Sequence, residues 1–256
     1  MRATDKGAKM QQADRAVRAA GALYLLLVVT SVFGLITSQS LIVPHDASAT
    51  AHNIRSSETL FRLALVSSVI ATIAFVFLAK ELYRLLSVVN RTQASLMVAL
   101  VLLSVPISFL SWLNQIAALR LIDGPALSGM GTSQMNGLAS FFLGLSSDTS
   151  ALNSIFFGLW LLPFGVLVIK SGFIPRILGY LVIIAGGAYL VGSLNFLLSA
   201  PLGPVVAGIV AVGYLGELGV VAWLVFKAAQ VQFRGGKSVI TNRTKNDSNF
   251  AGGNAW

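Results

Sequence analysis

Six long apolar segments dominate this sequence and limit what the chain can fold into. They cover residues 19–38, 60–86, 94–119, 152–169, 177–198 and 205–226. Each approaches or exceeds the roughly 20 residues that an α-helix needs to cross a hydrocarbon core about 30 Å thick. Only 11% of the residues are charged, against about 25% in a soluble domain. The pattern predicts an all-α, polytopic membrane protein, folded as a bundle of six transmembrane helices.

The basic residues predict how these helices are oriented. Of the 18 Lys and Arg residues, only Arg55, Arg62 and Arg120 fall on one side of the predicted spans, and the others fall on the opposite side. Because Lys and Arg are enriched on the cytoplasmic side of membrane proteins, both termini are predicted to be cytoplasmic. The net charge of +9 then indicates contact with anionic lipids at the cytoplasmic face rather than with nucleic acid.

Two tails flank a transmembrane domain that we place at residues 19–227. Residues 1–18 are predicted to form a basic cytoplasmic tail, and the first span lacks a clean cleavage site for removal as a signal peptide. Residues 228–256 are rich in Gly, Asn and Lys, so we expect a disordered cytoplasmic tail. The chain has no cysteine, which excludes disulfides, thiolate catalysis and Cys-ligated metals.

The first link between spans, residues 39–57, contains a predicted helix start. Pro44 and Asp46 precede an Ala-rich stretch at 47–54. An aspartate in that place is a favoured N-cap, because its side chain accepts a hydrogen bond from one of the first free N–H groups of the helix.

The link at 122–147 is long and rich in Gly, Ser and Met. Its second half, 138–145, is apolar but too short to cross a membrane, so we expect an interfacial or re-entrant segment there. Asp148 is then the predicted N-cap of the fourth span.

A tight hairpin is predicted between the fourth and fifth spans. Gly172 suits the left-handed position after a helix, and Pro175 suits the first turn of the next one. Pro106 and Pro163 lie inside predicted spans, where proline removes a backbone hydrogen bond and bends the helix.

Glu217 is the first candidate for chemistry, because it lies near the middle of the last span. A charged side chain at the bilayer centre costs about 2.5–3.5 kcal/mol on insertion scales, so it normally faces the bundle interior and has a partner. One interpretation is a proton or cation site, or an anchor for a polar ligand. The other is a protonated carboxyl that serves packing, which the nearby Gly213, Gly216 and Gly219 favour.

Several polar side chains of other spans are candidate partners for Glu217. They are Asn114, Gln115, Asn153, Tyr189, Asn195 and Tyr214. Together they would line a polar cavity open to the outer leaflet. The alternative is that these buried amides tie helices together, at about 0.6 kcal/mol each.

Three charges mark the predicted outer boundary of the membrane, namely Arg62, Arg120 and Asp148. An Arg–Asp pair would join the outer helix ends, and two arginines would hold an anionic head group or substrate. The alternative is that these side chains only extend to the interface.

The sequence carries no complete catalytic or metal-binding motif. His45 and His52 are the only histidines, and with Asp46 and Glu58 they do not match a known zinc pattern. There is no GxSxG, P-loop or GxGxxG motif. We therefore expect no metal and no cofactor, and intramembrane enzyme activity remains a lesser alternative.

Several stretches resemble the bacterial membrane family catalogued as domain of unknown function 4386. They are LIVPHDASATAHNI at 41–54, LFR at 60–62, LYRLLSVVN at 82–90, FFGLWLLPFG at 156–165, SGFIPRILG at 171–179, GEL at 216–218 and WLV at 223–225. The resemblance implies a multi-pass protein of the bacterial cytoplasmic membrane, and it carries over no activity. It marks Pro44, Asp46, Arg62, Pro175, Arg176 and Glu217 as family positions of unknown role.

Two function hypotheses follow from these observations. The first is binding or transport of a small polar or lipid-like ligand in an intramembrane polar cavity around Glu217, with proton coupling as one variant. The second is a non-catalytic accessory protein that acts through helix–helix contacts with an unidentified protein partner.

Overall fold

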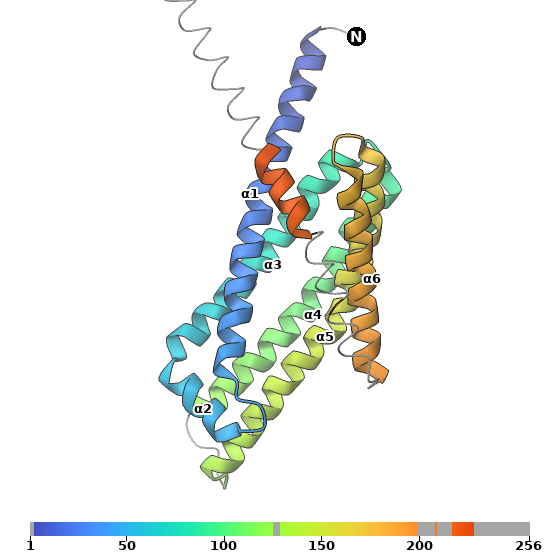
Figure 1. Ribbon diagram of the computed structural model, residues 1–256. Coiled ribbons are helices and arrows are strands. Elements are labelled where there is room, and N and C mark those ends of the chain that lie inside the picture. The colour runs from blue at the N-terminus through green and yellow to red at the C-terminus, as the bar shows by residue number, and fades with distance from the viewer. Residues whose placement is uncertain (1–2, 125–128, 199–207, 209–216, 228–256) are drawn as a thin grey trace, which may run out of the picture.

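The computed structural model describes residues 3–124, 129–198, 208 and 217–227, and this part of the chain contains helices and no strand (Figure 1). The labelled helices are α1 (Ala3–Leu41), α2 (Ala47–Ser56), α3 (Glu58–Leu86), α4 (Arg91–Asp123), α5 (Thr132–Ser171) and α6 (Arg176–Leu198). Residues 217–227 form a further helical segment. The predicted all-α fold is confirmed.

Within the described residues, five helices are long and apolar enough to cross a membrane. They are α3, α4, α5, α6 and the part of α1 from Arg15 to Leu41. The protein is therefore a multi-pass membrane protein. Half of the sixth predicted span, residues 205–207 and 209–216, lies outside the described residues, so the number six and the cytoplasmic placement of both termini stay predictions. The tail at 228–256 also lies outside them.

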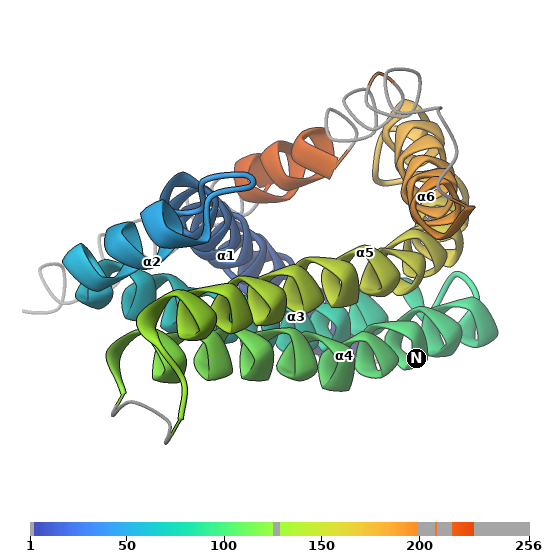
Figure 2. The ribbon, with the colours of Figure 1, turned by 90° about the horizontal axis from the view of Figure 1, so that it is seen from below.

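The helices pack in a simple order. α1 lies against α3, α3 against α4, α4 against α5, and α5 against α6, whereas α1 and α5 do not pack on each other within the described part of the chain. Figure 2 shows the segment 217–227 between α1 and α6. This segment joins the main core through Val220, Val221 and Leu224.

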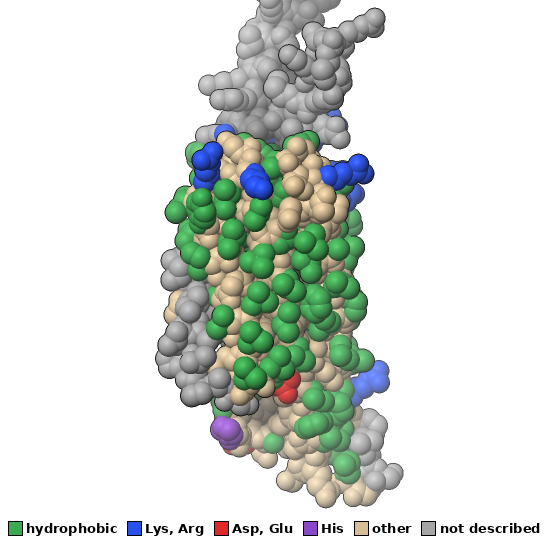
Figure 3. Space-filling model, turned by 90° about the vertical axis from the view of Figure 1, so that its right-hand side faces the viewer, with side chains coloured by type: hydrophobic (Ala, Val, Ile, Leu, Met, Phe, Trp, Pro, Cys, Tyr) green, Lys and Arg blue, Asp and Glu red, His purple; other side chains and the backbone are tan. Residues whose placement is uncertain are grey.

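The two ends of the bundle differ in charge. We call one the basic end, because the helices place Lys and Arg there from α3, α4, α5, α6 and the segment 217–227. These residues are Lys80, Arg84, Arg91, Lys170, Arg176 and Lys227. We call the other the α2 end, because the short helix α2 lies there against α5. Figure 3 shows Lys and Arg side chains gathered at one end, and a histidine at the other end, toward which a further Lys or Arg side chain also lies.

The predicted link at 122–147 is wrong in its second half. α5 begins at Thr132 and continues without a break to Ser171, so 138–145 is not a separate interfacial segment. Asp148 lies inside this helix and is not an N-cap. No proline interrupts the first half of α5, and its packing against α4 outweighs the weak helix propensity of its Gly and Ser residues.

Some other local predictions are confirmed. The Asp46 side chain caps α2, accepting a hydrogen bond of 2.8 Å from the Ala49 N–H. Gly172 ends α5 in the left-handed conformation, with φ of 72°. Pro175 was predicted in the first turn of α6 but lies one residue before it, where its carbonyl accepts a hydrogen bond from the Leu178 N–H. α1 begins at Ala3, so the helix of the first span extends back through most of the predicted tail.

Candidate functional site

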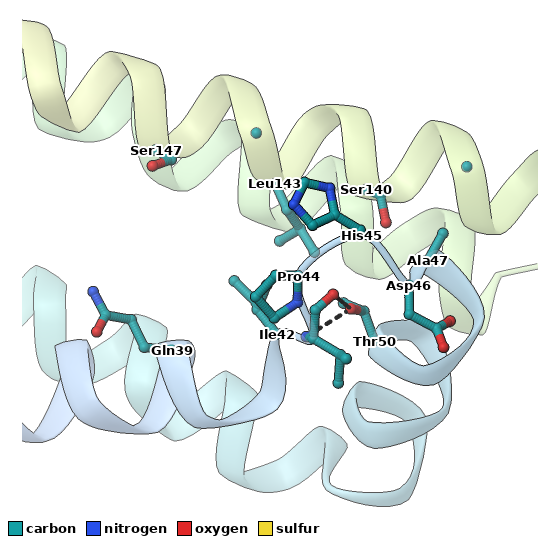
Figure 4. Close-up of a pocket in the computed structure, with 13 residues that line it drawn as sticks. Gln39, Ile42, Pro44, His45, Asp46, Ala47, Thr50, Ser140, Leu143 and Ser147 are labelled. Carbon is teal, nitrogen blue, oxygen red and sulfur yellow. Dashed lines mark hydrogen bonds between the residues drawn. The ribbon is translucent and has the colours of Figure 1, made fainter. Parts of the chain in front are cut away.

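A pocket of about 680 Å³ opens at the α2 end, between the α1–α2 loop and α5 (Figure 4). Its volume lies within the range of roughly 300–1,000 Å³ that is typical of small-molecule sites. The loop side consists of Gln39, Ile42, Val43, Pro44, His45, Asp46, Ala47 and Thr50. The α5 side consists of Gly137, Ser140, Leu143, Gly144 and Ser147.

The pocket exists because α5 presents small residues to the loop. Gly137, Ser140, Gly144 and Ser147 recur at intervals of three and four, which places them on one face of the helix. A Cβ atom built on Gly137 or Gly144 would have no neighbouring atom within 4 Å among the residues that the structure describes. The missing side chains therefore leave open space.

Hydrogen bonds hold the opposite wall in place. The Val43 N–H donates to the Thr50 hydroxyl oxygen at 2.9 Å, and this hydroxyl donates to the Val43 carbonyl at 3.2 Å. The Asp46 N–H also donates to the Val43 carbonyl, at 3.2 Å. The loop is thus attached to α2 through Thr50, and the bond between Asp46 and Val43 closes the turn that contains Pro44.

His45 is the one non-glycine residue with a positive φ in the described part of the chain, at 62°. This left-handed conformation is uncommon for residues other than glycine. Figure 4 shows the imidazole extending from the loop toward α5. The backbone conformation thus directs a ring with both donor and acceptor capacity into the pocket.

The charge of the pocket wall is low. Asp46 contributes a carboxylate to the wall, and the described residues that line the pocket include no Lys or Arg. The nearby Arg62 pairs with Glu58 on its own helix. Arg55 donates to the Ile122 carbonyl at 2.5 Å and lies 3.9 Å from the Asp123 carboxylate.

The pocket lies near the end of the apolar part of the helices. On α5, 23 residues separate Ser147 from Lys170 at the basic end, and 23 residues of α1 separate Leu41 from Arg18. At 1.5 Å per residue, each separation is about 35 Å. A bilayer has a hydrocarbon core of about 30 Å and spans about 40–45 Å with its head groups. Gly137, at the far side of the pocket, is 33 positions from Lys170, or about 50 Å. The pocket therefore begins at head-group depth, on the side opposite the basic end, and extends outward from it.

Glu217 lies in a second polar cluster, inside the bundle. Its side chain forms a hydrogen bond with Tyr189 of α6, and the Tyr24 side chain of α1 lies near it. Within the described part of the chain, the Tyr24 hydroxyl and Oε1 of Glu217 are buried without a hydrogen-bond partner. Tyr214 lies outside the described residues.

Asn153 belongs to a different polar network, between α4 and α5. Its side-chain amide donates to the Ser108 hydroxyl at 2.9 Å. Nearby, Ser111 contacts Ser146 at 2.8 Å, and Gln115 donates to Ser146 at 3.0 Å. These contacts join two helices. Asn114 on α4 and Asn195 on α6 are half-buried.

The three charges predicted at the outer boundary, namely Arg62, Arg120 and Asp148, do not pair with one another among the described residues. Arg62 pairs with Glu58, while Arg120 in the last turn of α4 and Asp148 within α5 are exposed. Arg55 forms the link between helix ends at this side, and sequence reasoning did not select it for that role. The sequence feature that could have pointed to this role is the position of Arg55 in the last turn of α2.

The pocket itself was also missed, although two of its residues, Pro44 and Asp46, were selected as family positions. The signal that would have pointed to it is the row of small residues at 137–147. In the part of the chain that the structure describes, no group of three or more His, Asp or Glu side chains is placed to hold a metal ion.

Comparison with curated proteins and with solved structures finds no match for this chain. A family model does match, over residues 19–228, which is most of the sequence. The stretch 41–54, which forms the loop wall of the pocket, lies within that match. The chain belongs to the family described as Domain of unknown function (DUF4386).

Proposed function

We propose that this membrane protein binds a small polar or lipid-like ligand in the pocket at the α2 end. The observation that carries the proposal is the pocket itself, which combines a volume of about 680 Å³ with hydrogen-bonding groups from two separate walls. Sites for small molecules typically have this form, with mostly apolar walls and a few placed polar groups. Ile42, Pro44 and Leu143 supply the apolar part.

The loop wall supports binding because its shape is maintained without a ligand. The Thr50 hydroxyl bonds to Val43 of the loop, and the Asp46 carboxylate accepts a hydrogen bond from the Ala49 N–H at the start of α2. A preformed wall loses less conformational entropy when a ligand binds, which favours affinity. This pocket replaces the surroundings of Glu217 as our first candidate site.

Native mass spectrometry of protein extracted gently from its own membrane tests the proposal. The informative variant is Gly144→Leu, which fills the pocket from a position where a Cβ meets no atom. Gly187→Leu is the matched control, because Gly187 is a helical glycine on α6 that also has open space. We expect a bound mass on the wild type and on Gly187→Leu, and its loss from Gly144→Leu. An equal bound mass on all three proteins would contradict the proposal.

We propose as a second candidate that Glu217 holds a proton or a small cation. Two buried atoms, one from Tyr24 and one from Glu217, have no hydrogen-bond partner among the described residues, and they support this. Glu217→Gln preserves the size of the side chain and a hydrogen bond to Tyr189 while it removes the charge. A proton or cation role predicts normal assembly and melting temperature, together with loss of any cation-dependent stabilisation. A lower melting temperature without that loss would assign Glu217 to packing. Protein that co-purifies with both forms would favour the accessory role.

A further inference from the structure

We infer that the ligand of this pocket is a membrane lipid with a zwitterionic, amine-bearing head group. The inference rests on the proposed binding function and names its ligand class. The head group would occupy the space between the α1–α2 loop and α5. An acyl chain would descend from it along α1.

The first argument is depth. The inner side of the pocket, at Ser147, lies about 35 Å from the basic residues at the other end, which is the level of the opposite head groups, and the pocket extends outward from there. Its polar groups, among them His45 and Ser147, therefore lie where lipid head groups are found. A lipid reaches this site by lateral diffusion, without leaving the bilayer.

The second argument is the path for an acyl chain. Gln39 lines the pocket on α1, and Val32, Leu35 and Ile36 precede it on the same face of the helix. These three side chains are 47%, 55% and 62% exposed. Among the described residues, no Cα atom of α1 lies within 8 Å of a Cα atom of α5, so the backbones of these two helices stay apart below the pocket. An apolar strip thus continues from the polar pocket into the hydrocarbon layer.

The third argument is charge. Asp46 is exposed and lines the pocket, and one of its oxygens caps Ala49. A carboxylate has further acceptor sites, so it can also accept a hydrogen bond from an ammonium group. Arg55 and Arg62 are the basic side chains of α2 and of the first turns of α3, and each is engaged with an acidic partner. Among the described residues that line the pocket, an anionic head group would therefore meet the Asp46 carboxylate and no Lys or Arg. The ammonium group of an amine-bearing zwitterion would instead bind to the Asp46 carboxylate.

The decisive variant is Asp46→Asn. Asparagine caps helices about as well as aspartate, so α2 should still form, while the charge is removed. Full-length protein is reconstituted in nanodiscs that contain ethanolamine, choline and glycerol phospholipids in equal parts. The lipids that remain bound after mild detergent release are then quantified by native mass spectrometry. The wild type, Asp46→Asn, Gly144→Leu and the control Gly187→Leu are compared, and the melting temperature of each is recorded.

We expect the wild type and Gly187→Leu to retain the ethanolamine lipid at least about threefold above its bulk share, as suits one exposed charge pair. Asp46→Asn should retain lipid without this preference, and Gly144→Leu should retain less lipid of every kind. Enrichment of the anionic glycerol lipid on the wild type, or an ethanolamine preference that survives Asp46→Asn, would overturn the inference.

The inference and the proposed function fail in different ways. If the wild type carries a non-lipid mass that Gly144→Leu lacks, the pocket binds a ligand but the ligand is not a lipid. If Gly144→Leu and Gly187→Leu retain the same bound species, the pocket is not the binding site, and both statements are wrong. If Gly144→Leu does not fold, Gly144→Ala replaces it as the variant that narrows the pocket, and Asp46→Asn still tests the preference for the ethanolamine lipid.

Discussion

Thr50 holds Val43 by two hydrogen bonds through a single hydroxyl group, at 2.9 Å from the Val43 N–H and 3.2 Å to the Val43 carbonyl. Thr50 is buried in the second turn of α2, whereas Val43 lies in the loop beyond Leu41, the last residue of α1. The hydroxyl thus acts as the backbone partner that Val43 would have in a regular element. It fixes where the loop wall of the pocket lies relative to α2.

Thr50→Val should loosen this wall. Valine has nearly the same shape as threonine but leaves the N–H and the carbonyl of Val43 without this partner, which costs about 1–3 kcal/mol when a group is buried. We expect a lower melting temperature in detergent and a reduced amount of bound ligand. Thr50→Ser keeps the hydroxyl and should retain both properties. An unchanged melting temperature for Thr50→Val would show that the two hydrogen bonds contribute nothing to stability.

The contact between α5 and α6 depends on reciprocal glycines. A Cβ on Gly165 would lie 2.8 Å from the Gly179 carbonyl oxygen, and a Cβ on Gly179 would lie 2.8 Å from the Gly165 carbonyl oxygen. Gly165→Ala should therefore force the helices apart and cost about 1–3 kcal/mol, as overpacking does in a close-packed interior.

Gly187→Ala is the control for that substitution. Gly187 lies in α6 with no atom within 4 Å of an added Cβ, so alanine should stabilise the helix by roughly 0.5–1 kcal/mol. Thermal unfolding should shift in opposite directions for the two variants. Shifts of the same sign would mean that helix propensity, rather than the close approach, decides stability here.

Apolar length and helix caps could be predicted from the sequence because they depend on residues that are close along the chain. Asp46 reaches an N–H only three residues away, and Gly172 requires only its own backbone conformation. The spans follow from apolar length, since a bilayer of fixed thickness requires it. These predictions needed no knowledge of which helices are neighbours.

The pocket could not be predicted in this way, because it combines segments about 100 residues apart. Gly137 and Gly144 reveal space only when the α1–α2 loop is known to lie opposite them. The same holds for the length of α5. The residues before Asp148 have the composition of a link, and packing against α4 makes them helical.

Ser111 should contribute modestly to the contact between α4 and α5. Its hydroxyl lies within hydrogen-bonding distance of the Ser146 carbonyl and of the hydroxyls of Ser146 and Ser150, at 2.8–3.0 Å. Hydrogen bonds between membrane helices average about 0.6 kcal/mol, so Ser111→Ala should destabilise less than Gly165→Ala. Ser154→Ala is the control, because the Ser154 hydroxyl bonds only to its own helix among the described residues. Equal melting temperatures for the two serine variants would argue against a role of this network in stability.

His45 should be required for binding and dispensable for folding. Its φ of 62° suits glycine, and its exposed ring extends toward α5 at the pocket (Figure 4). His45→Gly should leave the melting temperature unchanged or slightly higher, because glycine adopts this backbone conformation without steric cost. The variant should nevertheless bind less ligand, since the imidazole donor and acceptor are lost. His45→Val separates the two effects, because a β-branched residue is strongly disfavoured at positive φ and should lower both stability and binding. Calorimetry in detergent and native mass spectrometry of the same samples measure the two quantities, and a large loss of stability in His45→Gly would show instead that the ring itself holds the loop in place.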